Sequence, residues 1–404
     1  MQILRTSLII IISLLTVLLA GCKQHSKNEP EPIPIPDPVP GNAEGVTIVY
    51  AINNSSLSGI FRRDTAEIKA AMDSIDMSCQ KLLLYLTDTD STTCLLELQQ
   101  VQNKKKRLLT WRKVKEYDRQ QTSTAPAVMK RVISDALSVY PDAEHSLIFW
   151  GHGTAWTPGF SDHETRSDVP ADVPAQHSYG GEYGKDNEWQ WAEITDIANA
   201  IPDGAFETIW FDCCYMSSIE VAYQFRNKTQ MYVAYPTEVW DEGLNYNEVL
   251  PYIMRKNQDL VGGAAEFYSY YNKKNDAVTV SVMDMNSIEA VAQATRALMQ
   301  QYPDEIGKVT CVSNYRRGGT YGYYDMMQLL KLKDQGELWQ GVQDSMNRFV
   351  VYHAESSKDF NNRQWVQTPL CGVSMHSLGE YGQKEADHEP FYRTLDWYKA
   401  VYEQ

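Results

Sequence analysis

The sequence predicts an α/β fold in which a mostly parallel central sheet is covered by helices on both faces. Short runs of apolar and β-branched residues recur along the chain, and segments with helical periodicity separate them. These runs are continuously apolar instead of alternating, which is typical of strands buried on both faces. Repeated strand–helix–strand units of this kind form parallel sheets. With 404 residues, 43% of them hydrophobic, the chain is long enough to bury a large core.

The strands and helices are predicted in chain order from these runs. The predicted strands cover residues 46–52, 81–86, 146–150, 207–211, 231–235 and 277–285. The predicted helices include Ala127 to Tyr140, Ala192 to Ile201, Ile219 to Arg226 and Ser287 to Tyr302. An apolar run at 371–378 predicts one more strand, before a last helix from Phe391 to Tyr402. Residues 154–188, rich in Gly, Pro, Ser and Asp, predict a long loop, which inside a compact domain is usually functional or disordered.

The first residues of the chain predict export. Arg5 precedes an apolar run from Leu8 to Leu19 that is too short to span a bilayer comfortably, as in a secretory signal peptide. The small residues before Cys22 resemble the bacterial lipobox, in which this cysteine becomes the lipid-modified first residue of the mature chain. The resemblance implies a signal peptide over 1–21 and a lipid anchor in the bacterial cell envelope, at the outer membrane or the cell surface. The alternative is an ordinary cleaved signal peptide.

A proline-rich stretch follows the expected anchor. Proline stands at every second position from Pro30 to Pro40, which fixes φ repeatedly and favours a stiff polyproline tether. We therefore expect a tether over 22–44 and a folded domain over 45–404, with a C-terminal elaboration from about residue 285.

Composition narrows the partners and the chemistry. The net charge of −15 argues against nucleic acid or an anionic membrane surface as the partner, and it mildly favours cationic ligands. Six cysteines remain after Cys22, but a chain with a large core of its own does not need disulfides to fold. The spacings typical of structural zinc sites are absent from the sequence, so we predict no metal site.

The predicted strand at 146–150 ends in a candidate general base. His152 follows it, between Gly151 and Gly153. Glycine on each side leaves the backbone open, so that the imidazole can project at the edge of the sheet and a substrate can come close. A single histidine after a strand is, however, more often structural.

The predicted strand at 207–211 ends in a candidate nucleophile. Asp212 and the adjacent Cys213 and Cys214 follow it, and Ser217 with Glu220 predicts a capping box that opens the next helix. A cysteine near a helix N-terminus gains thiolate character, and a nearby imidazolium stabilises the thiolate further. The alternative is that each cysteine is only a small buried hydrophobe.

Both candidates lie at carboxyl ends of predicted parallel strands, where open α/β sheets place their ligands. A Cys/His pair is the nucleophile and general base of acyl transfer. The residues "FWGHG" and, some sixty residues later, "WFDCCYMSSIEVAYQ" resemble the clostripain family of cysteine peptidases. The resemblance extends through "VYAINNSSL", "WAEITDIANAI", "YVAYPTEVWDEGLNYNEVL" and "CGVSMHSLGEYG", so it covers most of the chain from 46 to 400.

The resemblance implies a caspase-like sandwich and a cysteine endopeptidase with a Cys/His dyad. Cys214 takes the nucleophile's position and His152 that of the base, while Cys213 stands where Ala is usual and is expected to pack away from the site. The backbone N–H groups of Gly153 and Cys214 would form the oxyanion hole. A vicinal disulfide between the two cysteines is the alternative. No cofactor is required, although calcium, which some relatives need, stays open.

The resemblance also implies cleavage after Arg or Lys in polypeptide substrates. Asp212 would bind the cation, and Glu238, Asp241 and Glu242 are candidates for a second acid beside it. The alternative for Asp212 is a turn or helix-cap residue without substrate contact. The family pattern often has an Asp before the paired asparagines, where this chain has Ile52, and this departure leaves room for altered substrate choice.

Family members are often activated by cutting themselves between the His and the Cys. Residues 154–188 contain two basic residues, Arg166 and Lys185. We favour Lys185, which lies just before a segment predicted to be helical from Trp189.

We expect the protein to be a monomer. The competing hypothesis from another class is a catalytically inactive surface binding protein on a peptidase scaffold.

Overall fold

The computed structural model describes residues 43–87, 93–103, 106–118, 121–158, 177–184, 188–303, 311–316, 322–331, 336–377 and 389–403. The described residues, from 43 onward, belong to one compact unit. The expected signal peptide, Cys22 and the proline-rich stretch therefore lie outside the described residues. None of the helices in the described ranges is long and apolar enough to cross a membrane.

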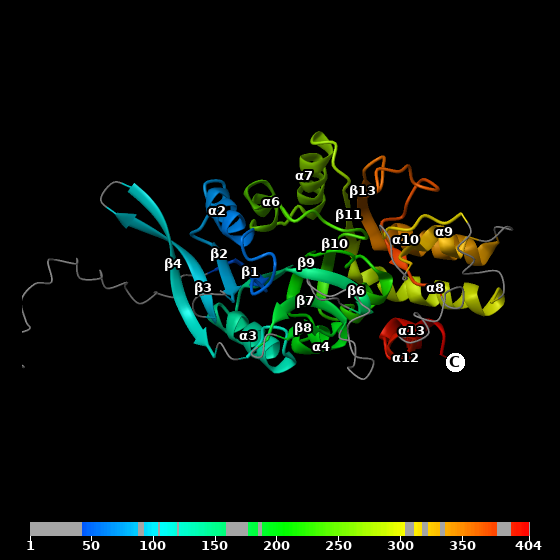
Figure 1. Ribbon diagram of the computed structural model, residues 1–404, viewed down its shortest axis with the longest axis horizontal. Coiled ribbons are helices and arrows are strands. Elements are labelled where there is room, and N and C mark those ends of the chain that lie inside the picture. Colours follow the sequence, from blue (N-terminus) through cyan, green and yellow to red (C-terminus); the bar gives the residue numbers. More distant parts are fainter. Residues whose placement is uncertain are drawn as a thin grey trace, which may run out of the picture. The chain divides into compact units, whose positions relative to one another are not determined.

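The central sheet has nine strands within the described residues, in the order β13-β11-β10-β9-β5-β1-β2-β3-β4 (Figure 1). Its middle is parallel and consists of β10 (Thr229–Ala234), β9 (Phe206–Asp212), β5 (Glu144–Trp150), β1 (Gly45–Ala51) and β2 (Gln80–Leu86). All five match predicted apolar runs. The prediction of a mostly parallel sheet is therefore confirmed.

Antiparallel strands extend the sheet on both sides. They are β11 (Thr279–Asp284) and β13 (Val350–Glu355) at one edge, and β3 (Thr93–Asn103) and β4 (Lys106–Tyr117) at the other. Of these four, only β11 coincides with a predicted apolar run. The β3–β4 hairpin was missed because its sequence mixes polar and apolar residues, as strands near a sheet edge do.

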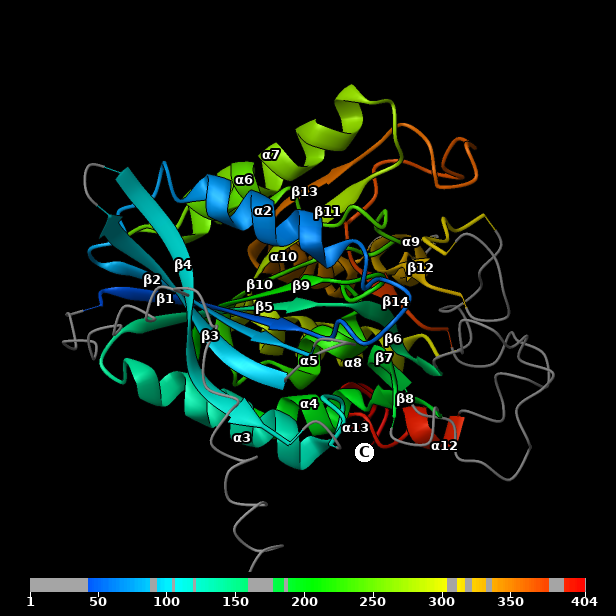
Figure 2. The ribbon, with the colours of Figure 1, turned by 60° about the vertical axis from the view of Figure 1, so that its left-hand side comes forward.

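Helices cover both faces, as predicted (Figure 2). One face carries α2 (Phe61–Ala71), α6 (Tyr246–Ile253) and α7 (Leu260–Lys273), whose apolar sides form one core cluster with the sheet. The other face carries α3 (Pro126–Val139), α4 (Ile194–Ala200), α5 (Ile219–Gln224), α8 (Ile288–Gln301) and α10 (Glu337–Phe349), around a second and larger cluster. The 3-10 turn η1 (Met285–Ser287) joins β11 to α8.

The predicted loop over 154–188 is wrong where the structure describes it. Gly151 has a φ of +151° and ends β5, and the chain then enters β6 (His152–Pro158) of a separate three-stranded sheet. Its partners are β7 (His177–Tyr183) and β8 (Trp189–Ala192), so the segment from Trp189 begins as a strand and not as a helix. Local composition does not reveal this sheet, because its pairing is between distant segments.

The C-terminal region differs in detail from the prediction. The run at 371–378 contributes only the two-residue strand β14 (Ser374–Met375), which pairs with β12 (Tyr324–Asp325) ahead of the short helix α9 (Met326–Leu330). The predicted last helix is divided into α12 (Glu389–Tyr392) and α13 (Asp396–Val401) by a turn in which the Thr394 N–H donates to Phe391 O, 2.8 Å away.

Candidate active site

The two adjacent cysteines have different environments. Cys213 is fully buried, and its Sγ lies 3.3 Å from the carbonyl oxygen of Phe149, among the side chains that face α3, α4 and α5. Cys214 is partly exposed, and its Sγ accepts from the N–H of Val239 at 3.3 Å. All six cysteines in the described ranges are free thiols. Cys214 is therefore the thiol that a substrate could reach.

The chain turns sharply directly after Cys214. Tyr215 has a φ of +66°, a left-handed conformation that is uncommon for a bulky residue and costs free energy. Its N–H donates to the carbonyl oxygen of Thr237 at 2.8 Å, and its ring lies 4.9 Å from that of Tyr323 between centroids. The surrounding structure thus holds a strained turn next to the thiol, as is common where a side chain must project from the end of a strand.

Gly153 brings the histidine segment against the cysteine segment. A Cβ atom on Gly153 would lie 2.5 Å from Cys214 O and 3.2 Å from Cys214 N, so only glycine fits without a shift of the backbone. β5 and β9 are also neighbours in the sheet, with Trp150 directly opposite Asp212. His152 and Cys214 therefore extend from the same edge of two adjacent strands.

The imidazole of His152 has a hydroxyl and two indole rings as neighbours. Its Nε2 is 3.0 Å from Oγ of Ser56, a residue of the loop after β1. The rings of Trp189 and Trp191 are nearby, each 6.2 Å from the imidazole between centroids. Ser56 was missed as a site residue, although it belongs to the early stretch "VYAINNSSL" that resembles the family.

The expected activation of the thiol by a helix is wrong for this state of the protein. Burial raises the pKa of Cys214 to about 12, and the carboxylates of Glu238 and Asp212 raise it further. The next helix, α5, begins five residues later and is short. The predicted capping box is also wrong, because Ser218 is the N-cap and Ser217 Oγ donates to Gly372 O at 2.7 Å. The raised pKa favours the neutral thiol, so its attack on a substrate requires a base.

Asp212 is a buried acid at the end of β9. It is only 3% exposed, and its Oδ2 accepts from Leu244 N and from Tyr246 Oη, each at 3.1 Å. Its Oδ1 has no hydrogen-bond partner. Burial raises the pKa of this carboxyl to about 7. The contacts tie Asp212 to the start of α6 and leave one of its acceptor oxygens without a partner.

A sequence model described as the clostripain family matches residues 49–364, most of the chain. The chain belongs to the clostripain family. It is a cysteine protease, and the recognition of the family from its motifs is confirmed. No curated protein matches it.

Solved structures of clostripain-family proteases share the fold over almost the whole chain. A secreted C11 cysteine protease from Bacteroides thetaiotaomicron, in complex with an irreversible peptide inhibitor, is 25% identical, with a TM-score of 0.72 over 90% of this chain and 100% of that chain. An inactive zymogen C11 protease from Parabacteroides distasonis is also 25% identical, with a TM-score of 0.72 over 89% and 99%. The α/β sandwich with a mostly parallel sheet is therefore the clostripain-family fold.

The other acids predicted for a clostripain-type specificity site have separate positions. Glu238 is half-buried and close enough to Cys214 to raise the pKa of its thiol, whereas Asp241 is exposed. Glu242 is engaged in ion pairs, with Oε2 2.6 Å from Lys274 Nζ and Oε1 3.8 Å from Arg63 Nη1. Its charge is thus already compensated.

One buried acid beside this site was missed. Asp64, on α2, is fully buried, and its Oδ2 accepts from Trp150 Nε1 at 2.9 Å. A single aspartate in an amphipathic helix carries no signal in the sequence, so only the packing of α2 on the sheet reveals it.

Two other predictions concern the self-cleavage residues and a metal site. The self-cleavage candidates Arg166 and Lys185 lie outside the described residues. Within the described ranges, no group of three or more His, Cys, Asp or Glu side chains is arranged to hold a metal ion.

Proposed function

We propose that this protein is an exported, lipid-anchored endopeptidase that hydrolyses peptide bonds after Arg or Lys, with Cys214 as the nucleophile and His152 as the general base and acid. The observation that carries the assignment is the close approach of Gly153 to the backbone of Cys214, beside the only one of the two adjacent thiols that is accessible. Family membership supports the reaction class.

In this mechanism the neutral thiol loses its proton as it reacts. His152 takes the proton while Sγ of Cys214 attacks the substrate carbonyl carbon, and the C–N bond then breaks as the imidazolium protonates the leaving amine. The backbone N–H groups of Gly153 and Cys214 would stabilise the oxyanion. Water, activated by the same imidazole, then hydrolyses the acyl-enzyme and restores the thiol.

Selection of a basic side chain is assigned to Asp212. A buried carboxylate with an acceptor oxygen left without a partner is a natural site for a guanidinium or ammonium group. Substrates are therefore polypeptides with accessible Arg or Lys residues.

Hydrolysis of fluorogenic peptides ending in Arg, Lys or Ala tests this assignment. Cleavage after Arg or Lys should persist in the Cys213→Ala variant and fall by at least about 10³-fold in Cys214→Ala, since the nucleophile is removed. Activity that depends on Cys213 instead, or that does not discriminate against Ala, would contradict the proposal.

Activation by self-cleavage belongs to the proposal, with Arg166 now favoured over Lys185. Gly184 N donates to Glu188 O at 2.7 Å, and these residues bound a gap of three residues between the paired strands β7 and β8. A segment extended in the active site would have to break this pairing around Lys185. Arg166 lies in the longer interval between β6 and β7. Mass spectrometry of active protein would identify the cut, and a fully active intact chain would refute it.

Export and anchoring rest on the first residues of the sequence. The proposed parts are a signal peptide over 1–21, a tether over 22–44 with lipid on Cys22, and a monomeric peptidase domain over 45–404 with its elaboration from about 285. One similar structure is of a secreted protease. Labelling of cells with a fatty-acid analogue should mark the wild-type protein and not the Cys22→Ala variant. If the wild-type protein is not labelled, the lipid anchor is refuted and the alternative, an ordinary cleaved signal peptide, takes its place.

A further inference from the structure

Two buried carboxyl groups face the same side of the central sheet, and within the described residues no cationic side chain lies within hydrogen-bond distance of either. Asp64 is fully buried and Asp212 is 3% exposed, and both belong to the layer between the sheet and helices α2 and α6. Trp150 connects them, because it lies opposite Asp212 in the β5–β9 pairing and its indole N–H donates to Asp64 Oδ2 at 2.9 Å. The two acids therefore approach each other at the carboxyl edge of the sheet.

Each of the two carboxyl groups retains an oxygen without a hydrogen-bond partner. These atoms are Oδ1 of Asp64 and Oδ1 of Asp212. The nearest cation to the former is Arg63, whose Nη2 is 3.6 Å away, beyond hydrogen-bond distance, and whose side chain is 42% exposed. A buried acceptor without a partner costs free energy, and two of them in one region indicate that a donor is missing.

The electrostatics of the two acids are linked. Burial raises the pKa of Asp64 to about 8, with the charge of Asp212 as the second cause. The other charged groups that act on this pair are Arg63 and Glu67 of α2. Glu67 in turn feels Glu242 and Lys274, which pair with each other. None of these groups neutralises both acids, so a cation placed between them would stabilise both charged forms.

We propose that Asp64 is the second carboxylate of the selectivity pocket, so that the cationic end of the substrate's Arg or Lys side chain is held between Asp64 and Asp212. A guanidinium group has five N–H donors in a planar fork, enough for both orphaned oxygens, whereas an ammonium group offers three. This inference rests on the proposed function. It replaces Asp241, which is exposed, and Glu242, whose Oε2 is hydrogen-bonded to Lys274 Nζ at 2.6 Å, as the second acid.

The test uses the full, processed chain and the variant Asp64→Asn. Asn keeps an oxygen that can accept from Trp150 Nε1 and removes only the charge. The kcat/KM for peptides ending in Arg or Lys should fall about 100-fold, mainly through a higher KM, while kcat/KM for a peptide ending in Gln should stay within about twofold. Asp73→Asn is the matched control, because it removes the same charge just beyond the end of α2, where the side chain is exposed, and should leave all three values unchanged.

Three outcomes separate this inference from the proposed function. If Asp212→Asn abolishes the preference for basic residues and Asp64→Asn leaves it intact, the inference fails and the proposed function stands. If Asp64→Asn lowers activity equally on Arg and Gln peptides, its role is structural and the inference again fails. If the wild type shows no preference for basic residues, the proposed function itself fails.

A measurement on the wild type covers the case in which Asp64→Asn does not fold. Agmatine carries the guanidinium group of arginine, and calorimetric titration in buffers of different ionisation enthalpy counts the protons released when it binds. At pH 6.5 we expect more than one proton per site, because two carboxyl groups must lose protons. A release of one proton or fewer would overturn the inference.

Discussion

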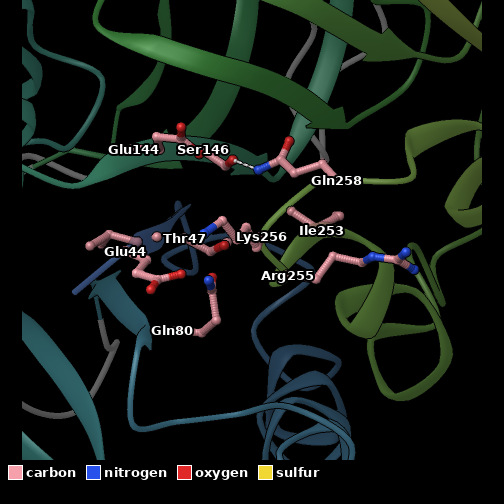
Figure 3. A pocket seen from close by; sticks show the side chains of 11 residues that line it. Glu44, Thr47, Gln80, Glu144, Ser146, Ile253, Arg255, Lys256 and Gln258 are labelled. Atoms are coloured by element: carbon pink, nitrogen blue, oxygen red, sulfur yellow. Dashed lines mark hydrogen bonds between the residues drawn. The ribbon is translucent and has the colours of Figure 1, made fainter.

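The cavity at the amino ends of the parallel strands and the site at their carboxyl ends satisfy their polar groups in different ways. At the amino ends lies a cavity of about 310 Å³, whose lining is polar and charged (Figure 3). There Gln258 accepts from Thr208 Oγ1 and donates to Ser146 Oγ, both at 2.6 Å. At the carboxyl ends, by contrast, two buried carboxyl groups retain oxygens without partners and Tyr215 occupies a left-handed conformation.

The difference shows at which end a bound ligand would gain free energy, because a ligand can supply hydrogen bonds only to groups that lack them. The cavity at the amino ends is roomy, but the half-buried amide of Gln258 in its lining is already hydrogen-bonded, so a ligand would gain little there. The carboxyl ends are tightly packed and contain strain and orphaned acceptors, as functional sites often do. Buried acceptors without partners and backbone strain, more than the volume of a cavity, indicate the position of the active site in this protein.

Gly153→Ala should have the largest effect among the substitutions that compare the two ends. The new Cβ would meet Cys214 O at 2.5 Å and Cys213 Cβ at 2.9 Å, so the backbone must move at the oxyanion site. We expect kcat to fall by about 10² to 10³-fold. Gly45→Ala at the amino end is the control, because its Cβ meets only the end of the flexible Gln80 side chain. Equal effects of the two substitutions would remove the distinction.

Stability should depend on pH because of the carboxyl end. The pKa of Asp212 is raised from its ordinary value of 3.8 to about 7, so the folded state prefers the protonated form. The stabilisation that this carboxyl contributes to the free energy of unfolding is therefore fully present below pH 3.8. It is lost as the pH rises through 7, and the loss amounts to up to about 4 kcal/mol. Urea unfolding at pH values from 5 to 8 should show a smaller loss of unfolding free energy for Asp212→Asn than for the wild type. Identical dependence of the unfolding free energy on pH in the two proteins would contradict this.

Ser56→Ala should have a smaller effect, confined to catalysis. Its hydroxyl lies 3.0 Å from Nε2 of His152 on an exposed loop, so it can orient the imidazole without supporting the core. We expect kcat to fall about threefold to tenfold, with KM and Tm unchanged. Ser58→Ala, two residues further on in the same loop, provides the comparison. A loss shared by both variants would point to the loop and not to the hydrogen bond.

Gln258→Ala should leave catalysis unchanged. It removes both hydrogen bonds of the amide at the amino end, which should lower the free energy of unfolding by about 1 to 2 kcal/mol. The kcat/KM for Arg peptides should stay within twofold of the wild-type value. A larger change in activity would show that the amino end takes part in function.

Much of the fold could be predicted because its signals are local. Continuously apolar runs predicted the five parallel strands, and the glycines beside His152 and the acid before the cysteines marked two strand ends. The three-stranded sheet of β6, β7 and β8 was missed, because its strands pair across a long segment of polar composition. The hairpin β3–β4 was missed for a different reason, since its strands mix polar and apolar residues and lack the continuous apolar run of the central strands.

The candidate site divides in a similar way. Motif spacing predicted that His152 and Cys214 lie at one edge of the sheet, and the order of β5 and β9 as neighbours agrees with this. The sequence could not show that burial raises the pKa of Cys214, since depth below the surface is a property of the assembled fold. It also could not show that Glu242 pairs with Lys274.

The sequence by itself determined the family, the mostly parallel sheet and the two residue types of the dyad, because each depends on local composition and on short motifs. Only the tertiary structure decided which thiol is accessible, which acids are compensated and that Asp64 lies buried beside Trp150. These features depend on contacts between segments far apart in the chain. The free energy of a charged or polar group is set by the atoms that surround it after folding, and not by its neighbours in sequence.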